Sequence, residues 1–199
     1  LRATGCRGCA GNAGEGEVIK RGDGIRVVHP LFQEEGGGSI PTSPLQLRFG
    51  RITAQLARDL VGAWHSRLPE ITNWQVCSHC YGAECDGVWY ASAMWGPPIA
   101  REFNGRGYAE LRRFAIAPDA PKNTASRMLS WMVRAIRAEG FSVAISYQDT
   151  EVHNGTIYKA AGWIAKAKRR GGEDAWTSNV RRRNKCQAIG DKVRWELQL

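Results

Sequence analysis

The sequence predicts an α/β domain, because strand-like and helix-like segments alternate along most of its 199 residues. Residues 124–138 repeat apolar side chains with a helical period, and residues 143–147 form an apolar run of strand length. Residues 78–95 have the pattern of a β-hairpin around the turn Asp86-Gly87. Hydrophobic residues make up 43% of the chain, which is enough to bury a core.

Residues 1–44 form a glycine-rich arm that we expect to be irregular, apart from a short strand at residues 25–28. We therefore predict two parts, this arm and a folded domain over residues 45–199. No signal peptide is visible and no run of eighteen apolar residues occurs, so we expect a cytoplasmic protein without a membrane span.

The domain is expected to begin with a strand and an amphipathic helix and to end with two strands. Asn123 is expected to be the N-cap of the longest helix, and Gly140 to end it. Strands are expected at residues 45–52, 78–84, 88–95, 110–117, 143–147, 163–168 and 193–197, and helices at residues 53–64, at residues 124–138 and around Tyr158.

The segment after the strand at residues 143–147 is the most informative part of the chain. Asp149 ends that strand, and Asn154, Tyr158 and Gly162 follow at four-residue steps, which predicts that they share one helical face. Ligands in open α/β sheets bind beside such strand ends. The segment indicates either a binding site at the strand end or a short helix with a buried tyrosine.

Positive charge is concentrated near the C-terminus. The net charge is +9, and residues 159–199 hold eleven Lys and Arg against four acidic residues. Clustered cations favour a polyanionic partner, nucleic acid first, although a solvated basic tail would have the same composition. The residues expected to contact DNA are Lys168, Arg169, Arg170, Arg181, Arg182 and Arg183.

Four of the six cysteines form two pairs with the same spacing, Cys6 with Cys9 and Cys77 with Cys80. A glycine follows each pair two residues later, as in metal knuckles, where two thiolates hold one ion. Together the pairs predict a structural four-thiolate zinc site that would hold the arm to the domain. Free reduced thiols are the alternative, and disulfides are disfavoured in the absence of a secretory signal.

The order of strands and helices resembles that of the GNAT acyltransferase fold, which implies a mixed, largely antiparallel sheet flanked by helices. In that fold a helix N-terminus binds the pyrophosphate of coenzyme A. The resemblance places this cofactor-binding helix start at Lys122, Asn123, Thr124 and Ser126, for which simple helix capping is the alternative. The loop Pro121–Arg127 lacks the glycines usual in that superfamily, which argues against ordinary acetyl-CoA use.

Five short motifs follow one another along the domain. They are Trp64-His65, Glu110-Leu-Arg-Arg113, Pro121-Lys-Asn-Thr-Ala-Ser126-Arg, Ser146-Tyr-Gln-Asp149 and Gly155-Thr-Ile-Tyr158-Lys-Ala. In this order they are similar to motifs of the Mom family of phage DNA-modification proteins, over residues 45–199. The resemblance implies transfer of a carbamoylmethyl group to the exocyclic amine of adenine in DNA inside the host cell, which blocks restriction enzymes. The implied partners are DNA and a small-molecule group donor, an acyl-CoA or another compound.

The resemblance also implies roles for four residues. His65 and Asp149 would each be a base or a metal ligand, Tyr158 would be a proton donor or a ligand, and Arg113 would hold a phosphate or a carboxylate. Each has a structural alternative: a charged histidine at a helix end, a turn aspartate, a core tyrosine and a buried ion pair.

Iron is the other cofactor that the resemblance implies. His65, Asp149 and Tyr158 together would suit Fe(II), because imidazole and oxygen ligands bind that ion, and His79 or His153 are alternative ligands. Two other functions stay open: an acyl-CoA-dependent N-acyltransferase acting on a small amine or a protein, and a non-catalytic nucleic-acid-binding protein held together by zinc. Whether the chain forms a homodimer is also left open.

Overall fold

The protein is described here by a computed structural model, in which residues 18–21, 24–27, 40–65, 76–170 and 190–199 are placed. Two sets of predicted site residues lie outside this part of the chain, namely Cys6 and Cys9 of the zinc site and Arg181, Arg182 and Arg183 of the DNA contact. None of the described helices has the length and apolarity needed to cross a bilayer.

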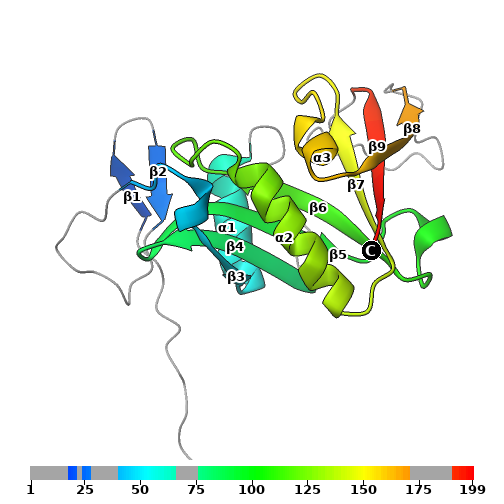
Figure 1. Ribbon diagram of the computed structural model, residues 1–199, viewed down its shortest axis with the longest axis horizontal. Coiled ribbons are helices and arrows are strands. Elements are labelled where there is room, and N and C mark those ends of the chain that lie inside the picture. The colour runs from blue at the N-terminus through cyan, green and yellow to red at the C-terminus, as the bar shows by residue number, and fades with distance from the viewer. Residues whose placement is uncertain (1–17, 22–23, 28–39, 66–75, 171–189) are drawn as a thin grey trace, which may run out of the picture.

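Seven strands form one sheet in the order β3-β4-β5-β6-β7-β9-β8 (Figure 1). Neighbouring strands are antiparallel except β6 and β7, which are parallel. This is the mixed, largely antiparallel sheet that the sequence predicts. The strands are β3 (Arg48–Arg51), β4 (His79–Cys85), β5 (Val88–Gly96), β6 (Tyr108–Ile116), β7 (Val143–Asp149), β8 (Ile164–Arg169) and β9 (Lys192–Gln198).

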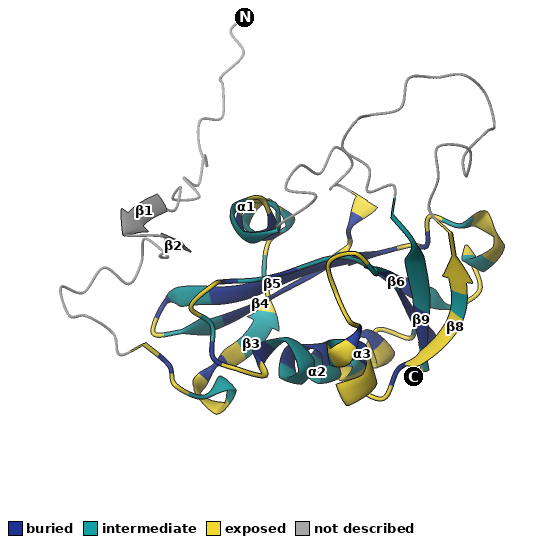
Figure 2. Cartoon of the chain, turned by 90° about the horizontal axis from the view of Figure 1, so that it is seen from above, coloured by how far each residue is buried: buried dark blue, intermediate teal, exposed yellow. Residues whose placement is uncertain are grey.

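Helices cover both sides of the sheet. The helix α1 (Ala54–Trp64) lies on one side, the α1 face, and the helices α2 (Thr124–Ala138) and α3 (Thr156–Ala160) lie on the other, the α2 face (Figure 2). The helix α1 begins one residue later than predicted, after Thr53, whose hydroxyl oxygen accepts a hydrogen bond from the Leu56 N–H at 3.2 Å. The site residues can therefore be assigned to one face or the other.

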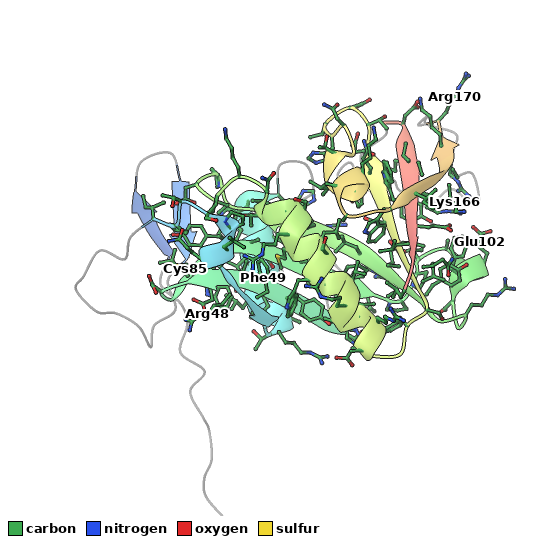
Figure 3. All side chains as sticks on the ribbon, in the orientation of Figure 1. Arg48, Phe49, Cys85, Glu102, Lys166 and Arg170 are labelled. Atoms are coloured by element: carbon green, nitrogen blue, oxygen red, sulfur yellow. The ribbon has the colours of Figure 1, made fainter. Side chains whose placement is uncertain are left out.

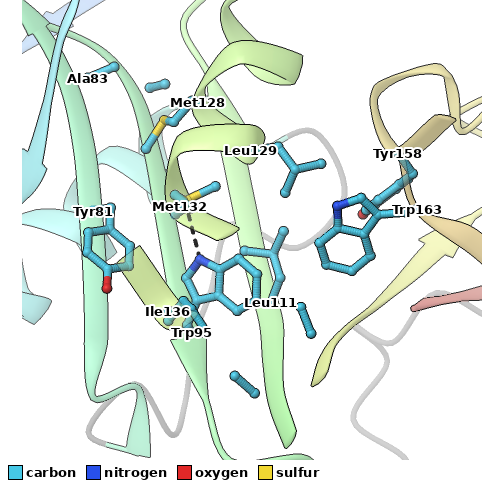
Figure 4. Packing of buried hydrophobic residues seen from close by; sticks show 14 of the residues in the cluster. Tyr81, Ala83, Trp95, Leu111, Met128, Leu129, Met132, Ile136, Tyr158 and Trp163 are labelled. Carbon is cyan, nitrogen blue, oxygen red and sulfur yellow. Dashed lines mark hydrogen bonds between the residues drawn. The ribbon is translucent and has the colours of Figure 1, made fainter. Parts of the chain in front are cut away.

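The main core lies between the sheet and α2 (Figure 4). Met128, Leu129, Met132 and Ile136 are fully buried and recur along α2 at the helical spacing that predicted this helix. Trp95 of β5 packs against them, and its indole N–H donates to the Met132 sulfur at 3.3 Å. Burial of side chains of this size stabilises the fold by about 2 kcal/mol each.

The hairpin of β4 and β5 turns at Asp86-Gly87, as predicted. Asp86 has φ 49° and Gly87 has φ 76°, the two positive values that a tight two-residue hairpin turn requires. A second antiparallel pair, β1 (Val18–Arg21) with β2 (Gly24–Val27), lies in the arm where the sequence predicts one short strand.

The strands β6 and β7 are paired over only part of their length. Their parallel pairing runs from Tyr108–Val143 to Leu111–Ser146 and ends there. Farther along, β6 pairs only with β5 and β7 only with β9, and the two strands diverge (Figure 1). The sheet is therefore split on the side where α2 begins and β7 ends.

Two predicted elements differ in extent from the structure. The strand predicted at residues 45–52 is shorter, because residues 44–46 form a 3-10 turn in which Ser43 and Gln46 cap each other's backbone. The predicted helical face of Asn154, Tyr158 and Gly162 is wrong, because α3 has only five residues and leaves Asn154 and Gly162 outside it.

Candidate active site at the split of the sheet

Tyr158 of α3 reaches the point where β6 and β7 part. Its hydroxyl lies 2.9 Å from the Ser146 Oγ, and that Ser146 hydroxyl donates to the Leu111 carbonyl oxygen at 3.3 Å. Either hydroxyl can be the donor in the hydrogen bond that they share. Leu111 and Ser146 are the last residues paired between the two strands, so the phenol lies at the start of the split.

Aromatic rings enclose Tyr158. Its ring stacks on Trp195 with centroids 5.3 Å apart. Trp163 lies edge-on to it at 5.6 Å (Figure 4). Burial raises the pKa of Tyr158, and the hydrogen bond with Ser146 only partly opposes this. The phenol therefore keeps its proton at neutral pH, which suits a proton donor and does not suit a base.

The turn after β7 is anchored by Gln148, to which the sequence analysis gives no role. Its Oε1 accepts a hydrogen bond from the Trp195 indole N–H at 2.7 Å, and its Nε2 donates to the His153 carbonyl oxygen. Gly155 fits under this amide because it lacks a side chain: a Cβ there would lie 2.6 Å from both the Gln148 Oε1 and the Trp195 Cζ2. The sequence signal was a glycine immediately before a helix.

Asp149 faces the opposite side of the sheet from Tyr158. Side chains alternate along a strand, so Ser146 and Gln148 point to the α2 face, whereas Tyr147 and Asp149 point to the α1 face. The Asp149 Oδ1 accepts a hydrogen bond from the Glu151 N–H at 3.0 Å, which orders the start of the turn.

Arg113 also belongs to the α1 face. It pairs with Met94, which packs in a cluster with Ala57 and Val61 of α1. Arg112 is an extra residue in β6, a β-bulge, because Met94 is opposite Arg113 and the next residue of β5 is opposite Leu111. Bulges re-aim side chains next to functional sites.

His65 ends α1, where its backbone N–H donates to the Val61 carbonyl oxygen at 2.8 Å. Burial, and then the positive charges of Arg113 and His153, lower the pKa of His65 to about 4. The imidazole is therefore neutral at pH 7 and can accept a proton. This corrects the alternative of a charged histidine at a helix end.

At the start of α2, two of the predicted cofactor-binding hydroxyl groups already donate to backbone carbonyl oxygens. Asn123 occupies the predicted N-cap position with φ 66°, but its side chain makes no capping hydrogen bond. The Thr124 hydroxyl donates to the Pro121 carbonyl oxygen at 2.7 Å, and the Ser126 hydroxyl donates to the Asn123 carbonyl oxygen at 3.2 Å. Lys122 and Asn123 are exposed, and these two side chains together with the first-turn N–H groups remain available to an anion.

The family model of the Mom protein family matches residues 46–187. The chain belongs to the Mom protein family. The match contains His65, Arg113, Asp149 and Tyr158, and it ends in the connection between β8 and β9. Comparison with curated proteins finds no match.

Solved structures show that this Mom family member has the GNAT acetyltransferase fold. An IAA acetyltransferase from Bacillus cereus is 14% identical with a TM-score of 0.57, and 77% of this chain covers 99% of that one. A Bacillus subtilis acetyltransferase in complex with CoA is 13% identical with a TM-score of 0.56, for 77% and 98% coverage. A GNAT family acetyltransferase from Elizabethkingia anophelis with acetyl-CoA bound is 11% identical with a TM-score of 0.57, for 77% and 99% coverage.

The iron ligands predicted for this Mom family member are not brought together. Asp149 and His65 belong to the α1 face, whereas the Tyr158 hydroxyl is held by Ser146 on the α2 face. Within the described ranges, no three or more His, Cys, Asp and Glu side chains form a group that could hold a metal ion. The donor set predicted for Fe(II) is therefore not assembled in this part of the chain.

Cys77 and Cys80 are buried thiols in the cluster under α1. Burial raises the pKa of both, that of Cys80 to about 12, so neither is a thiolate at neutral pH without a metal. The Cys80 thiol lies 3.7 Å from the Cys77 carbonyl oxygen. His79 between them packs edge-on against Phe141 and lies 3.6 Å from Glu139, away from both sulfurs. The other two predicted ligands, Cys6 and Cys9, lie outside the described residues, so the four-thiolate zinc site stays a prediction.

The described basic residues of this Mom family member extend along the edge strand β8. Lys168, Arg169 and Arg170 are exposed, and Lys168 forms an ion pair with Asp191 at 3.7 Å. Figure 3 shows Lys166 and Arg170 projecting at this edge of the molecule, beyond α3. Positive side chains on an edge strand also prevent unwanted strand pairing, so the edge has a structural reason for its charge.

Proposed function

We propose that this protein transfers a carbamoylmethyl-type group to the exocyclic amine of adenine in DNA. The observation that carries the proposal is membership of the Mom family across residues 46–187, on a fold that splits its sheet at Tyr158. We place the meeting of the donor and the acceptor at this split, because the Tyr158 hydroxyl lies at its start.

The described side chains suit the two proton movements of such a transfer. The adenine nitrogen forms a bond to the carbon of the incoming group and loses a proton, while the bond from that carbon to the leaving group breaks. Neutral His65 on the α1 face would take the proton from the amine, directly or through Asp149. Tyr158 would give its proton to the leaving group from the α2 face.

The donor would approach from the α2 face. Lys122 and the first turn of α2 offer positive charge and N–H groups to a phosphate. A solved structure of the same fold is in complex with CoA, which carries phosphates. Thr124 would contribute only through its backbone, because its hydroxyl is buried and already donates to Pro121. The donor is therefore an acyl-CoA or another small phosphate-bearing compound.

DNA would bind along the basic edge. The exposed cations of β8 would hold the phosphate backbone, which supplies affinity without sequence preference. Adenine N6 lies inside the duplex, so the base has to be flipped or the strand opened locally to reach the split.

The decisive experiment is nucleoside analysis. The protein is expressed in a bacterial host, the host DNA is digested to nucleosides, and mass spectrometry is used to search for an adenosine heavier by the transferred group. A Tyr158→Phe variant expressed to the same level serves as the control. Unmodified adenosine from folded wild-type protein would overturn the proposal.

A second function is favoured by one observation, the CoA and acetyl-CoA bound to structures of the same fold. It is acyl transfer from acyl-CoA to a small amine or to a protein. Acetyl-CoA hydrolysis or transfer by the purified protein, with no change in host DNA, would select it. If the protein is instead a non-catalytic DNA-binding protein, its DNA affinity should be unchanged after Asp149→Ala and Tyr158→Ala.

A further inference from the structure

Tyr147 is the first residue of β7 beyond the split in the sheet. It follows Ser146, the last residue of β7 that pairs with β6, and its side chain points to the α1 face, away from the Tyr158 hydroxyl. The side chain is half-buried, and in the described part of the chain its hydroxyl makes no hydrogen bond. The ring is therefore an aromatic surface beside the split that the proton movements proposed above do not use.

Arg194, the residue opposite Tyr147 in β9, is bound to other groups. It forms an ion pair with Glu196 at 2.9 Å, and its guanidinium carbon lies 4.7 Å from the centre of the Phe103 ring. Among the described residues, no aromatic ring and no guanidinium group lies over the ring of Tyr147. Arg194 thus leaves the face of this ring open to a ligand.

Two cations continue from β7 to the edge of the sheet on the same face. Lys192 pairs with Asp149 on one side and with Arg169 of β8 on the other, so the three side chains share the α1 face. Within the described ranges, no carboxylate lies within 4.0 Å of the Lys192 ammonium or the Arg169 guanidinium. Arg169 also acts electrostatically on Tyr147, which places its positive charge close to the ring.

This part of the α1 face extends from the split to the edge of the sheet. The helix α1 packs on β4, β5 and β6 and lies away from β9 and β8 (Figure 2). Neighbouring strands are about 4.8 Å apart, so the backbones of Lys192 and Arg169 lie about 5 Å and about 10 Å from that of β7. Two cations in line match successive phosphates of one nucleic-acid strand. A positive path that leads to an aromatic ring is how proteins hold single-stranded nucleic acid.

We propose that Tyr147 is the stacking platform for the base of a DNA nucleotide that has left the duplex, with Lys192 and Arg169 holding the phosphates next to it. Stacking on an aromatic ring replaces the neighbours that the base loses when it leaves the helix. The choice of DNA as the ligand rests on the proposed function, whereas the stacking site rests on the position of Tyr147. Every base has an aromatic face, so this contact by itself does not select adenine.

The test compares the binding of two short labelled strands to the full chain by fluorescence anisotropy. One strand consists of abasic sites and carries a single adenine, and the other is abasic throughout. The wild type is expected to bind the adenine strand about tenfold more tightly, because one base–aromatic stack is added. Equal affinity of the wild type for both strands would overturn the proposal.

Four variants assign the contacts. Tyr147→Leu is expected to lose the preference for the adenine strand and Tyr147→Phe to keep it, since only the second retains a ring. Arg169→Gln is expected to weaken the binding of both strands by the same factor, because both have the phosphates. Arg134→Gln, at an exposed arginine of α2 on the opposite face, is expected to bind both strands like wild type. A preference that survives in Tyr147→Leu would move the stacking to another residue and refute the proposal.

Ring-proton NMR of the wild type decides if Tyr147→Leu does not fold. The signals of Tyr147 are identified as those missing in Tyr147→Phe. The adenine strand is expected to shift them upfield, because a stacked base shields the protons of the ring below it, and the abasic strand is expected to leave them in place. Unmoved signals at saturating adenine strand contradict the stacking. AMP that shifts them at the same concentration as the adenine strand would overturn the choice of a strand over a free nucleotide.

The analysis of host DNA gives an independent result. Modified adenosine in host DNA, with no stacking on Tyr147, would refute this inference and leave the proposed function standing. Stacking on Tyr147 without modified adenosine would refute the proposed function and leave the stacking site standing.

Discussion

At the residue scale, the surroundings of a side chain decide what it can do. Tyr158 and His65 are both at least partly buried, and burial disfavours the charged form of each. At neutral pH the tyrosine therefore keeps its proton, and the histidine has an unprotonated ring nitrogen. A neutral phenol and a neutral imidazole thus arise from one physical effect on two faces of one sheet.

Replacing Tyr158 with Phe tests the proton donor. The change removes one hydrogen bond to Ser146 and should lower the free energy of unfolding by about 1 kcal/mol, with little change in packing. Formation of modified adenosine should fall by roughly a hundredfold or more, because the proton donor is gone. Tyr108→Phe in β6, where the ring packs against Phe103, is the matched control and should stay near wild type. Equal activity of both variants would show that the phenol donates no proton.

The pKa of His65 predicts a pH dependence of stability. In the unfolded chain the imidazole titrates near 6.5, and in the folded protein near 4, so the unfolded state binds more protons between these values. Stability should therefore fall as the pH drops from about 6.5 to about 4, by an amount on the order of 2 kcal/mol. Urea denaturation at several pH values measures this.

His65→Asn provides the comparison for that titration. The variant lacks the titrating group, so its stability should depend less on pH over the same interval. A slope equal to that of wild type would assign the acid sensitivity to other residues.

At the element scale, the turn between β7 and α3 depends on one glycine. Gly155 has φ 71° and lies directly against Gln148 and Trp195, so the start of α3 and the position of Tyr158 both follow from its missing side chain. The sequence shows a glycine there, but the residue it packs against, Trp195, lies forty residues later in the chain.

Gly155→Ala should be strongly destabilising. It adds a methyl group 2.6 Å from both the Gln148 Oε1 and the Trp195 Cζ2, and it places a Cβ in the left-handed region, for a combined cost of about 3 kcal/mol. Gly162→Ala is a matched control, because Gly162 has φ 78° but nothing lies within 4 Å of a Cβ there. It should cost only about 1 kcal/mol. Thermal unfolding of the two variants would contradict this account if both were destabilised equally.

Elements with strong local patterns could be predicted from the sequence. The helices α1 and α2 and the turn at Asp86-Gly87 have periodicity or turn residues that act over a few positions. The bulge at Arg112 could not be predicted, because it is a register shift between two strands and leaves no local pattern. The separation of Tyr158 from Asp149 could be predicted only in part. The alternation of side chains along β7 places Ser146 and Asp149 on opposite faces, but the contact of Tyr158 with Ser146 joins two elements and leaves no local pattern.

At the scale of the whole molecule, the exposed positive charge lies on one side of the split in the sheet. Exposed cations lie along the edge strand β8, on the same half of the sheet as β7 and β9. The fold could be predicted from the order of strands and helices. The molecule that binds to each face of the sheet could not.

The basic edge predicts how DNA binding responds to salt. Affinity should fall steeply with ionic strength, and neutralising Lys168, Arg169 and Arg170 together with Gln should reduce the log–log slope by about 2–3, because each phosphate that a cation no longer neutralises lowers it by roughly one. Fluorescence anisotropy with a labelled duplex at several salt concentrations measures the slope. Arg134→Gln on α2 provides the comparison, and a triple variant with the wild-type slope would move the DNA-binding surface elsewhere.

The pairing of β6 with β7 stops at Leu111 and Ser146, so beyond this point each of the two strands has a strand neighbour on one side only. In the proposed reaction the donor approaches Tyr158 from the α2 face, and the amine meets His65 from the α1 face. Two reactants that approach from opposite faces of a sheet do not compete for one place. The expected kinetics of the proposed transfer are therefore those of random-order binding to one ternary complex.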